Sequence, residues 1–285
     1  MKKIVWLLMM VVMPMVANAA FSRNADLDDE DELLHRLDQY IARRDEFSSK
    51  KEKKLVRMKK KQNLTSDKRE RLSLYNQIYR EYYTYRYDSA MVYANRGLQL
   101  AEQLHDTYYI DLNKINRAAV LSTGGFYSQA EDLLLSLKPE DISPKLIQYY
   151  YYILTWMYNY WGAFCERSEF KDEMQDKKRL YLAKSLEYVG NKQSALYYYL
   201  SGELEYLLHR TDKKVLGWYQ KALAASPIDS RVHASAAYCI ARYYQDNEQM
   251  DLYEKYLVEA AISDQVCPLK ENLALQELST YLYNK

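Results

Sequence analysis

The sequence predicts an all-α protein in which paired helices stack into an α-solenoid behind a long N-terminal helix. The chain has 285 residues, 48% of them hydrophobic, but only seven glycines and five prolines. Glycine and proline make up about 12% of average proteins, so this shortage of turn-forming residues argues against sandwiches, barrels and Gly-rich catalytic loops. Amphipathic segments recur in pairs about every forty residues with short linkers, which is the pattern of a solenoid.

The first nineteen residues have the pattern of a secretory signal peptide. A basic start precedes the apolar residues 4–16, and Ala17-Asn18-Ala19 offers the small residues after which signal peptidase cleaves. This apolar run is too short for a bilayer core, which needs about twenty residues. We therefore expect cleavage between Ala19 and Ala20 and export of the mature chain; the alternative is an uncleaved membrane anchor.

Two further segments precede the repeats. Residues 20–32 are expected to form an acidic flexible leader, because six of the seven residues from Asp26 to Glu32 are acidic. Residues 33–64 contain no glycine or proline, and apolar residues at heptad-like spacing predict one long basic amphipathic helix there. Its basic face is interpreted as a solvated surface or as a contact for anionic lipid, whereas nucleic acid is excluded as a partner of an exported protein.

Residues 65–285 are expected to form about five helix pairs and one unpaired C-terminal helix. Local signals mark several boundaries, with Asp67 as an N-cap, Gly124-Gly125 as a stop and Ser143-Pro144 as a start. The expected helices cover residues 72–83, 88–104, 109–123, 126–137, 145–164, 176–189, 193–210, 212–225, 229–245, 250–262 and 269–283.

No motif in the sequence points to an enzyme. The phosphate-binding, nucleophile-elbow and zinc-protease patterns are missing, and the one acyl-enzyme-like match, Ser48 with Lys51, lies in a lysine-rich stretch. The four histidines are too scattered to predict a zinc site. We therefore expect no catalytic residue, metal or cofactor. Cys165, Cys239 and Cys267 lie in apolar helical sequence and are expected to be buried thiols, with a Cys239–Cys267 bridge as the alternative.

Tyrosine is unusually abundant, at 31 residues, and its densest run contains the main candidate for a binding site. Tyr149, Tyr152, Trp156 and Tyr160 recur every three or four residues and so share one stripe of a helix. On a concave surface such rings would give a ligand large contact area with few rotatable bonds. Alternatively, the same rings fill the core and keep their hydroxyl groups at its edge. The sequence leaves both interpretations open.

Part of the repeat region resembles tetratricopeptide repeats. Val215, Tyr219, Ala222, Leu223 and Pro227 match the spacing of the second helix of that motif, within the run VLGWYQKALAASP. The run GGFYSQA also resembles the turn between the two helices of such a repeat. The resemblance implies tetratricopeptide-like helix pairs in which the first helix of each pair lines the concave side.

Four further runs, taken in order, carry a second resemblance: LLHRLDQYIARRDEFSSKKEKKL, YRYDSAMVYANRGLQLA, LLLSLK and YYYYILTWMY. They are similar to an uncharacterised family of exported helical-repeat proteins of Gram-negative bacteria that carry a domain of unknown function. This resemblance implies a periplasmic location. Members of that family continue into a transmembrane helix, a coiled coil and a cytoplasmic regulator-like segment, and this chain matches only the exported part.

Together these observations favour a non-enzymatic periplasmic interaction module. It would bind a peptide, a protein segment or a glycan on an aromatic-rich concave surface, and the family resemblance implies the sensor half of a membrane-associated regulator. The alternative is a structural scaffold or assembly factor for a cell-envelope complex, which would use its convex face or its basic N-terminal helix. Short peptides or oligosaccharides should raise the melting temperature of the first kind of protein and not of the second.

Overall fold

The computed structural model describes residues 32–267 and 272–285, and all regular structure in these ranges is helical. The expected signal peptide and most of the acidic leader therefore lie outside the described residues. The helices are α2 (Arg44–Leu64), α3 (Lys68–Tyr83), α4 (Tyr87–Gln103), α5 (Thr107–Thr123), α6 (Tyr127–Leu135), α7 (Pro144–Phe164), α8 (Lys171–Glu187), α9 (Ala195–Leu208), α10 (Lys213–Ala224), α11 (Arg231–Asp246), α12 (Met250–Val266) and α13 (Leu273–Asn284).

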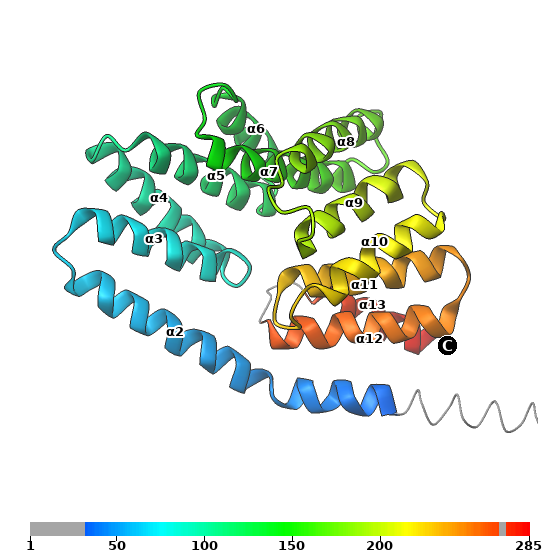
Figure 1. Ribbon diagram of the computed structural model, residues 1–285. Coiled ribbons are helices and arrows are strands. Elements are labelled where there is room, and N and C mark those ends of the chain that lie inside the picture. Colours follow the sequence, from blue (N-terminus) through cyan, green and yellow to red (C-terminus); the bar gives the residue numbers. More distant parts are fainter. Residues whose placement is uncertain (1–31, 268–271) are drawn as a thin grey trace, which may run out of the picture.

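Successive helices pack in pairs, and the pairs stack along a curved path (Figure 1). Each of the pairs α3–α4, α5–α6, α7–α8, α9–α10 and α11–α12 contacts the next, which confirms the predicted α-solenoid. The last helix, α13, is not left without a neighbour, because it packs on α12 and buries Ala274 and Leu278 there.

Local signals in the sequence set several of the helix ends. Asp67 caps α3 by accepting a hydrogen bond from the backbone N–H of Arg69, at 2.8 Å. Gly125 follows α5 with a φ of +82°, a left-handed conformation that glycine adopts without steric cost. Pro144 begins α7, where its missing N–H would have no partner within the helix in any case.

Neighbouring pairs bury their apolar faces against each other, so the core runs along the solenoid. In α10, the motif residues Val215, Tyr219 and Ala222 are almost fully buried, together with Ile240 of α11. Gly202 of α9 permits this close packing, because a Cβ atom there would lie 2.6 Å from the ring of Tyr219. The tetratricopeptide-like spacing therefore corresponds to the contact between one helix and the next.

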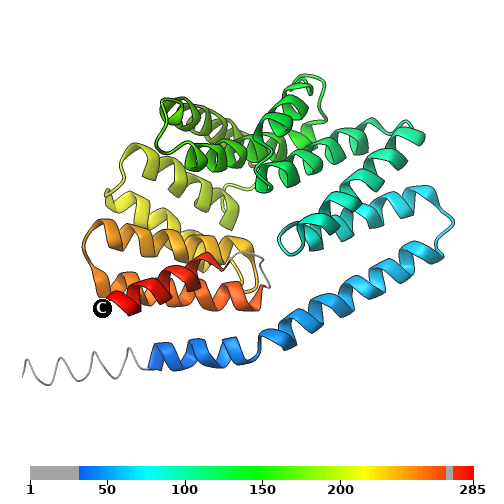
Figure 2. The ribbon, with the colours of Figure 1, turned by 180° about the vertical axis from the view of Figure 1, so that it is seen from behind.

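The N-terminal segment differs from the expectation of one continuous helix over residues 33–64. The chain turns at Arg43, which separates a helical stretch at residues 32–42 from α2. Residues 32–42 lie beside α12, whereas the rest of the segment runs back to α3 (Figures 1 and 2). We call residues 32–64 the N-terminal strap, because they connect the two ends of the solenoid.

Buried leucines anchor the strap at both ends. Leu37 is 4% exposed and belongs to the core cluster of α9 to α13, while Leu55 is fully buried beside Ile78 of α3. An ion pair of 2.8 Å between Arg36 and Glu259 reinforces the first contact. The turn at Arg43 follows from this arrangement, since one straight helix would not reach both surfaces with its apolar side.

Part of the basic charge of α2 is paired with acidic groups of the solenoid. Lys54 contacts Glu81 at 2.6 Å, and Lys61 contacts Glu70 at 2.9 Å. The ammonium group of Lys59 also lies 5.1 Å from the centre of the Tyr82 ring. This face of α2 is thus a packing surface as well as a solvated one. Among the helices of the described residues, none has the length and apolar composition that a membrane span requires.

Candidate functional site

The four aromatic residues singled out in the sequence share one face of α7, and each is half-buried. Their surroundings differ along the helix. The hydroxyl of Tyr149 donates to Asn116 Oδ1 at 3.1 Å, and Tyr152 packs against both main core clusters. The ring of Trp156 stacks on Tyr199, with their centres 6.1 Å apart and their planes 9° from parallel. Tyr160, at the other end of the stripe, lines a cavity.

The Tyr149 end of the stripe belongs to a buried polar network that joins α3, α5 and α7. Asn116 donates from Nδ2 to Asn76 Oδ1 at 3.1 Å, and its backbone carbonyl accepts from the hydroxyl of Tyr79 at 3.0 Å. Burial raises the pKa of Tyr149 to about 12, so the hydroxyl stays protonated and acts as a donor. At this end the stripe therefore has a structural role.

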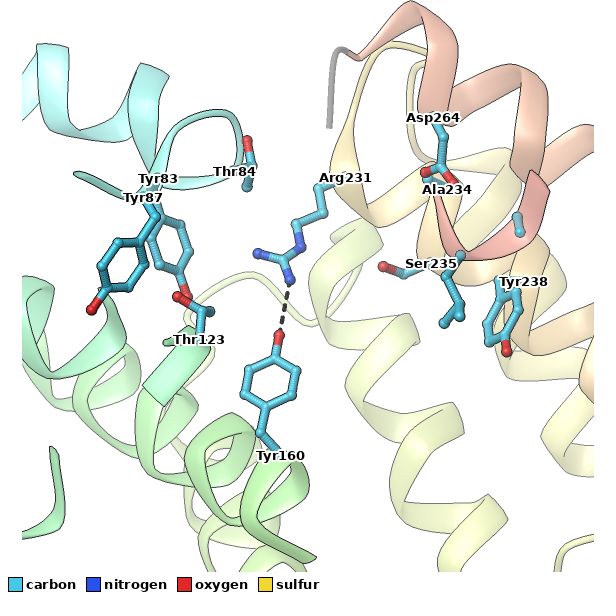
Figure 3. A pocket seen from close by; sticks show the side chains of 12 residues that line it. Tyr83, Thr84, Tyr87, Thr123, Tyr160, Arg231, Ala234, Ser235, Tyr238 and Asp264 are labelled. Carbon is cyan, nitrogen blue, oxygen red and sulfur yellow. Dashed lines mark hydrogen bonds between the residues drawn. The ribbon is translucent and has the colours of Figure 1, made fainter. Parts of the chain in front are cut away.

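The Tyr160 end opens into a cavity of about 160 Å³ on the inner side of the solenoid. Its walls come from elements far apart in sequence: the α3–α4 corner, the end of α5, α7, α11, α12 and α13 (Figure 3). Tyrosine rings and hydroxyl groups dominate the lining, which includes Tyr83, Tyr87, Thr123, Tyr160, Ser235 and Tyr238. The curvature of the solenoid brings these groups together.

Arg231 is the charged group at the centre of this cavity. It is the first residue of α11, and its guanidinium extends across the cavity towards α7 (Figure 3). Arg231 donates from Nη2 to the hydroxyl oxygen of Tyr160 at 3.2 Å, and its Cζ lies 5.8 Å from the centre of the Tyr83 ring. One side chain thus connects the two halves of the solenoid through an aromatic and hydroxyl environment.

The neighbours of Arg231 leave its charge uncompensated. Burial raises the pKa of Tyr83 well above its usual value, and burial likewise raises the pKa of Tyr152, so both phenols are neutral at physiological pH. Within the described ranges, no carboxylate lies within ion-pairing distance of the Arg231 guanidinium, which instead contacts tyrosines. The cavity therefore holds the cationic group of Arg231 in a mainly aromatic wall, to which Asp264 also contributes.

Sequence reasoning did not identify Arg231, Tyr83 or Ser235. The sequence around each of them carries no recognised motif, and the three residues come to line one cavity only because the solenoid curves. To predict these three residues, one would need to know which helix positions face the inner side of the curved solenoid. Tyr160, in contrast, was predicted from the spacing of three or four residues along the α7 stripe.

The expected signal-peptide cleavage site, between Ala19 and Ala20, lies outside the described residues. Cys165, Cys239 and Cys267 are free thiols, and burial raises the pKa of Cys239 well above its usual value. Where the structure is described, no three His, Cys, Asp or Glu side chains gather in a way that could hold a metal ion.

The chain matches the model of a known family. The family model described as "SusR N-terminal TPR domain", where TPR stands for tetratricopeptide repeat, matches residues 41–285. The match includes α2, so that helix belongs with the repeat domain. A search of curated proteins found no match.

Proposed function

Because the chain belongs to the SusR N-terminal TPR domain family, we propose that it is a non-enzymatic module that binds a segment of a partner protein on its inner surface. Tetratricopeptide domains generally mediate protein–protein interactions and are typically non-catalytic, and solenoids use their concave side for binding. This family property favours a peptide segment over a glycan as the ligand.

The cavity at Tyr160 carries this proposal. It is a concave site lined by aromatic rings, with hydroxyl groups and one cation that can fix the orientation of a bound chain. Rings such as Tyr83, Tyr160 and Tyr238 offer contact area at a small cost in side-chain entropy, which is characteristic of residues that dominate binding energy. The site is also supported from several helices, so its shape is largely preformed.

The proposal extends to location and to a sensory role. The signal-peptide pattern of residues 1–19 and the resemblance to exported proteins support a periplasmic module, and the matched family is described as an N-terminal domain of SusR. We propose that partner capture is the input of a membrane-associated regulator. Mass spectrometry of the mature protein isolated from the periplasm should give a chain that starts at Ala20; an intact N-terminus or a cytoplasmic protein would contradict export.

Site-specific photocrosslinking in living cells tests the binding surface. A benzoylphenylalanine residue in place of Tyr160 samples the inner cavity, and the same residue in place of Phe164, which is 79% exposed at the end of the same helix, is the matched control. We expect a defined partner to crosslink at position 160. A peptide taken from the crosslinked segment should then raise the melting temperature of the purified chain.

A second candidate function, a scaffold in an envelope complex, is favoured by one observation. The exposed ring of Phe164 lies 6.0 Å from Tyr127, which in turn stacks on Trp161 at 5.7 Å. A cluster with one exposed ring and two half-buried rings suits a protein contact on the surface. Crosslinks that form at position 164 and not at position 160 would favour the scaffold and overturn the inner-surface proposal.

A further inference from the structure

The guanidinium of Arg231 has more hydrogen-bond donors than it uses. Arginine carries five N–H donors, and the one hydrogen bond that this side chain makes with described residues is the bond from Nη2 to Tyr160. Figure 3 shows the group extending into the cavity and away from the body of α11, so the remaining donors face the space that a ligand would occupy.

The charge of this group also has no counterion among residues 32–267 and 272–285. Glu259, which contacts His233 of α11 at 3.3 Å, is also paired with Arg36 at 2.8 Å. Asp264 lines the same cavity from α12, and Figure 3 shows it beside Ala234 and apart from the guanidinium. A half-buried cation without a partner is costly, and an anion that enters the cavity would remove that cost.

Hydroxyl groups around the cation supply a second set of donors. Tyr83 and Ser235 line the cavity, and neither hydroxyl makes a hydrogen bond to another described residue. An oxygen atom held by the guanidinium could accept from one of them as well. The planar guanidinium matches the two oxygens of a carboxylate, and this pairing is stronger than a bond between neutral groups.

We propose that the cavity at Arg231 binds one carboxylate group of the partner segment, either its C-terminal carboxylate or an acidic side chain. This inference rests on the proposed function and names the ligand chemistry of the same site. A carboxylate carries one negative charge, which one arginine balances, whereas a phosphate monoester carries about two at neutral pH and would leave one of them uncompensated. The volume of about 160 Å³ suits a single residue bound between aromatic walls.

Paired small probes test the charge requirement on the purified chain. N-acetyl-leucine and N-acetyl-leucinamide differ only in carrying a terminal carboxylate or a neutral amide. The second pair is N-acetyl-aspartic acid α-amide, whose side-chain carboxylate is free, and N-acetyl-asparaginamide, whose side chain is a neutral amide; this pair samples an acidic side chain. Ligand-observed NMR titration gives each dissociation constant. We expect the acid of at least one pair to bind about 10- to 100-fold more tightly than its amide, because a hydrogen bond to a charged group increases affinity by about this factor.

Two variants assign the effect to the cavity. Arg231→Gln should abolish the difference between acid and amide, while Arg179→Gln, which removes an exposed arginine of α8 paired with Asp176, should leave it unchanged. Equal binding of acid and amide to the unaltered chain would overturn the inference even if Arg231→Gln failed to fold. So would an acid preference that survives in a folded Arg231→Gln variant.

The outcomes for the two proposals are separable. Crosslinks at position 160 together with no acid preference would support the inner binding surface and reject the carboxylate. An acid preference that depends on Arg231, in a chain that crosslinks at position 164 and not at position 160, would support the anion site and reject the proposed partner surface.

Discussion

Replacing Leu55 with alanine tests whether α2 is an integral part of the repeat domain. Leu55 is fully buried in the cluster that contains Ile78 and Tyr82 of α3. The substitution removes three buried carbon atoms, which at about 0.8 kcal/mol each amounts to about 2.4 kcal/mol of transfer free energy. The cavity left behind adds to this, so we expect Leu55→Ala to lower the free energy of unfolding by about 3 kcal/mol.

The neighbouring residue provides the control for this measurement. Val56 is 62% exposed on the same turn of α2, so Val56→Ala should change the free energy of unfolding by less than about 0.5 kcal/mol. Urea unfolding followed by circular dichroism at 222 nm gives both values from the midpoint and slope. A loss below about 1 kcal/mol for Leu55→Ala, or equal losses for the two variants, would show that α2 is not packed as described and refute the reasoning.

Three further predictions concern the strap, a histidine and two glycines. Leu37→Ala should speed amide hydrogen exchange in residues 32–42 more than in α3, because it weakens the anchor on the α9–α13 cluster; unchanged exchange there would contradict that anchor. The hydrogen bond to Glu259 raises the pKa of His233, so its contribution to stability is complete below the unfolded pKa of about 6.5 and is lost as the pH rises through the higher folded pKa. Between about pH 6 and pH 8 the unaltered chain should therefore lose unfolding free energy relative to His233→Gln, and parallel pH profiles of the two proteins would contradict the linkage. Gly202→Ala should destabilise by about 1–3 kcal/mol because its Cβ would overlap the ring of Tyr219, whereas Gly217→Ala, with no atom within 4 Å, should stabilise α10 by up to about 1 kcal/mol; thermal unfolding of both variants checks the opposite signs.

The sequence predicted the helices well where its signals are local. Gly124-Gly125 and Ser143-Pro144 fall at the end of α5 and the start of α7, and the motif residues around Tyr219 lie in a helix–helix contact. These features depend on neighbours in the chain, through caps, φ preferences and apolar spacing. Sequence reasoning is strong for such features because the causes and the consequences lie within a few residues.

The strap and the cavity were harder to predict because their causes lie in distant parts of the chain. Nothing around Arg43 breaks a helix, and the turn there results from packing on two separate surfaces. Arg231 has the sequence context of an ordinary solvated arginine at a helix start. The α7 stripe was recognised as one face, but whether it lies in the core or in a groove depended on the curvature, and the structure shows both along a single helix.

The N-terminal strap packs on both ends of the solenoid and so closes it into a ring. An open solenoid can widen by a small change at any one repeat, whereas this closed one can widen only if the packing of Leu37 or of Leu55 is lost. The cavity is linked by contacts to the Leu37 end of the strap. Arg231 and His233 both lie in the first turn of α11, and His233 contacts Glu259, which accepts a hydrogen bond from Arg36 of the strap. A displacement of this turn would therefore act, through His233 and Glu259, on the ion pair that holds Arg36 of the strap to α12.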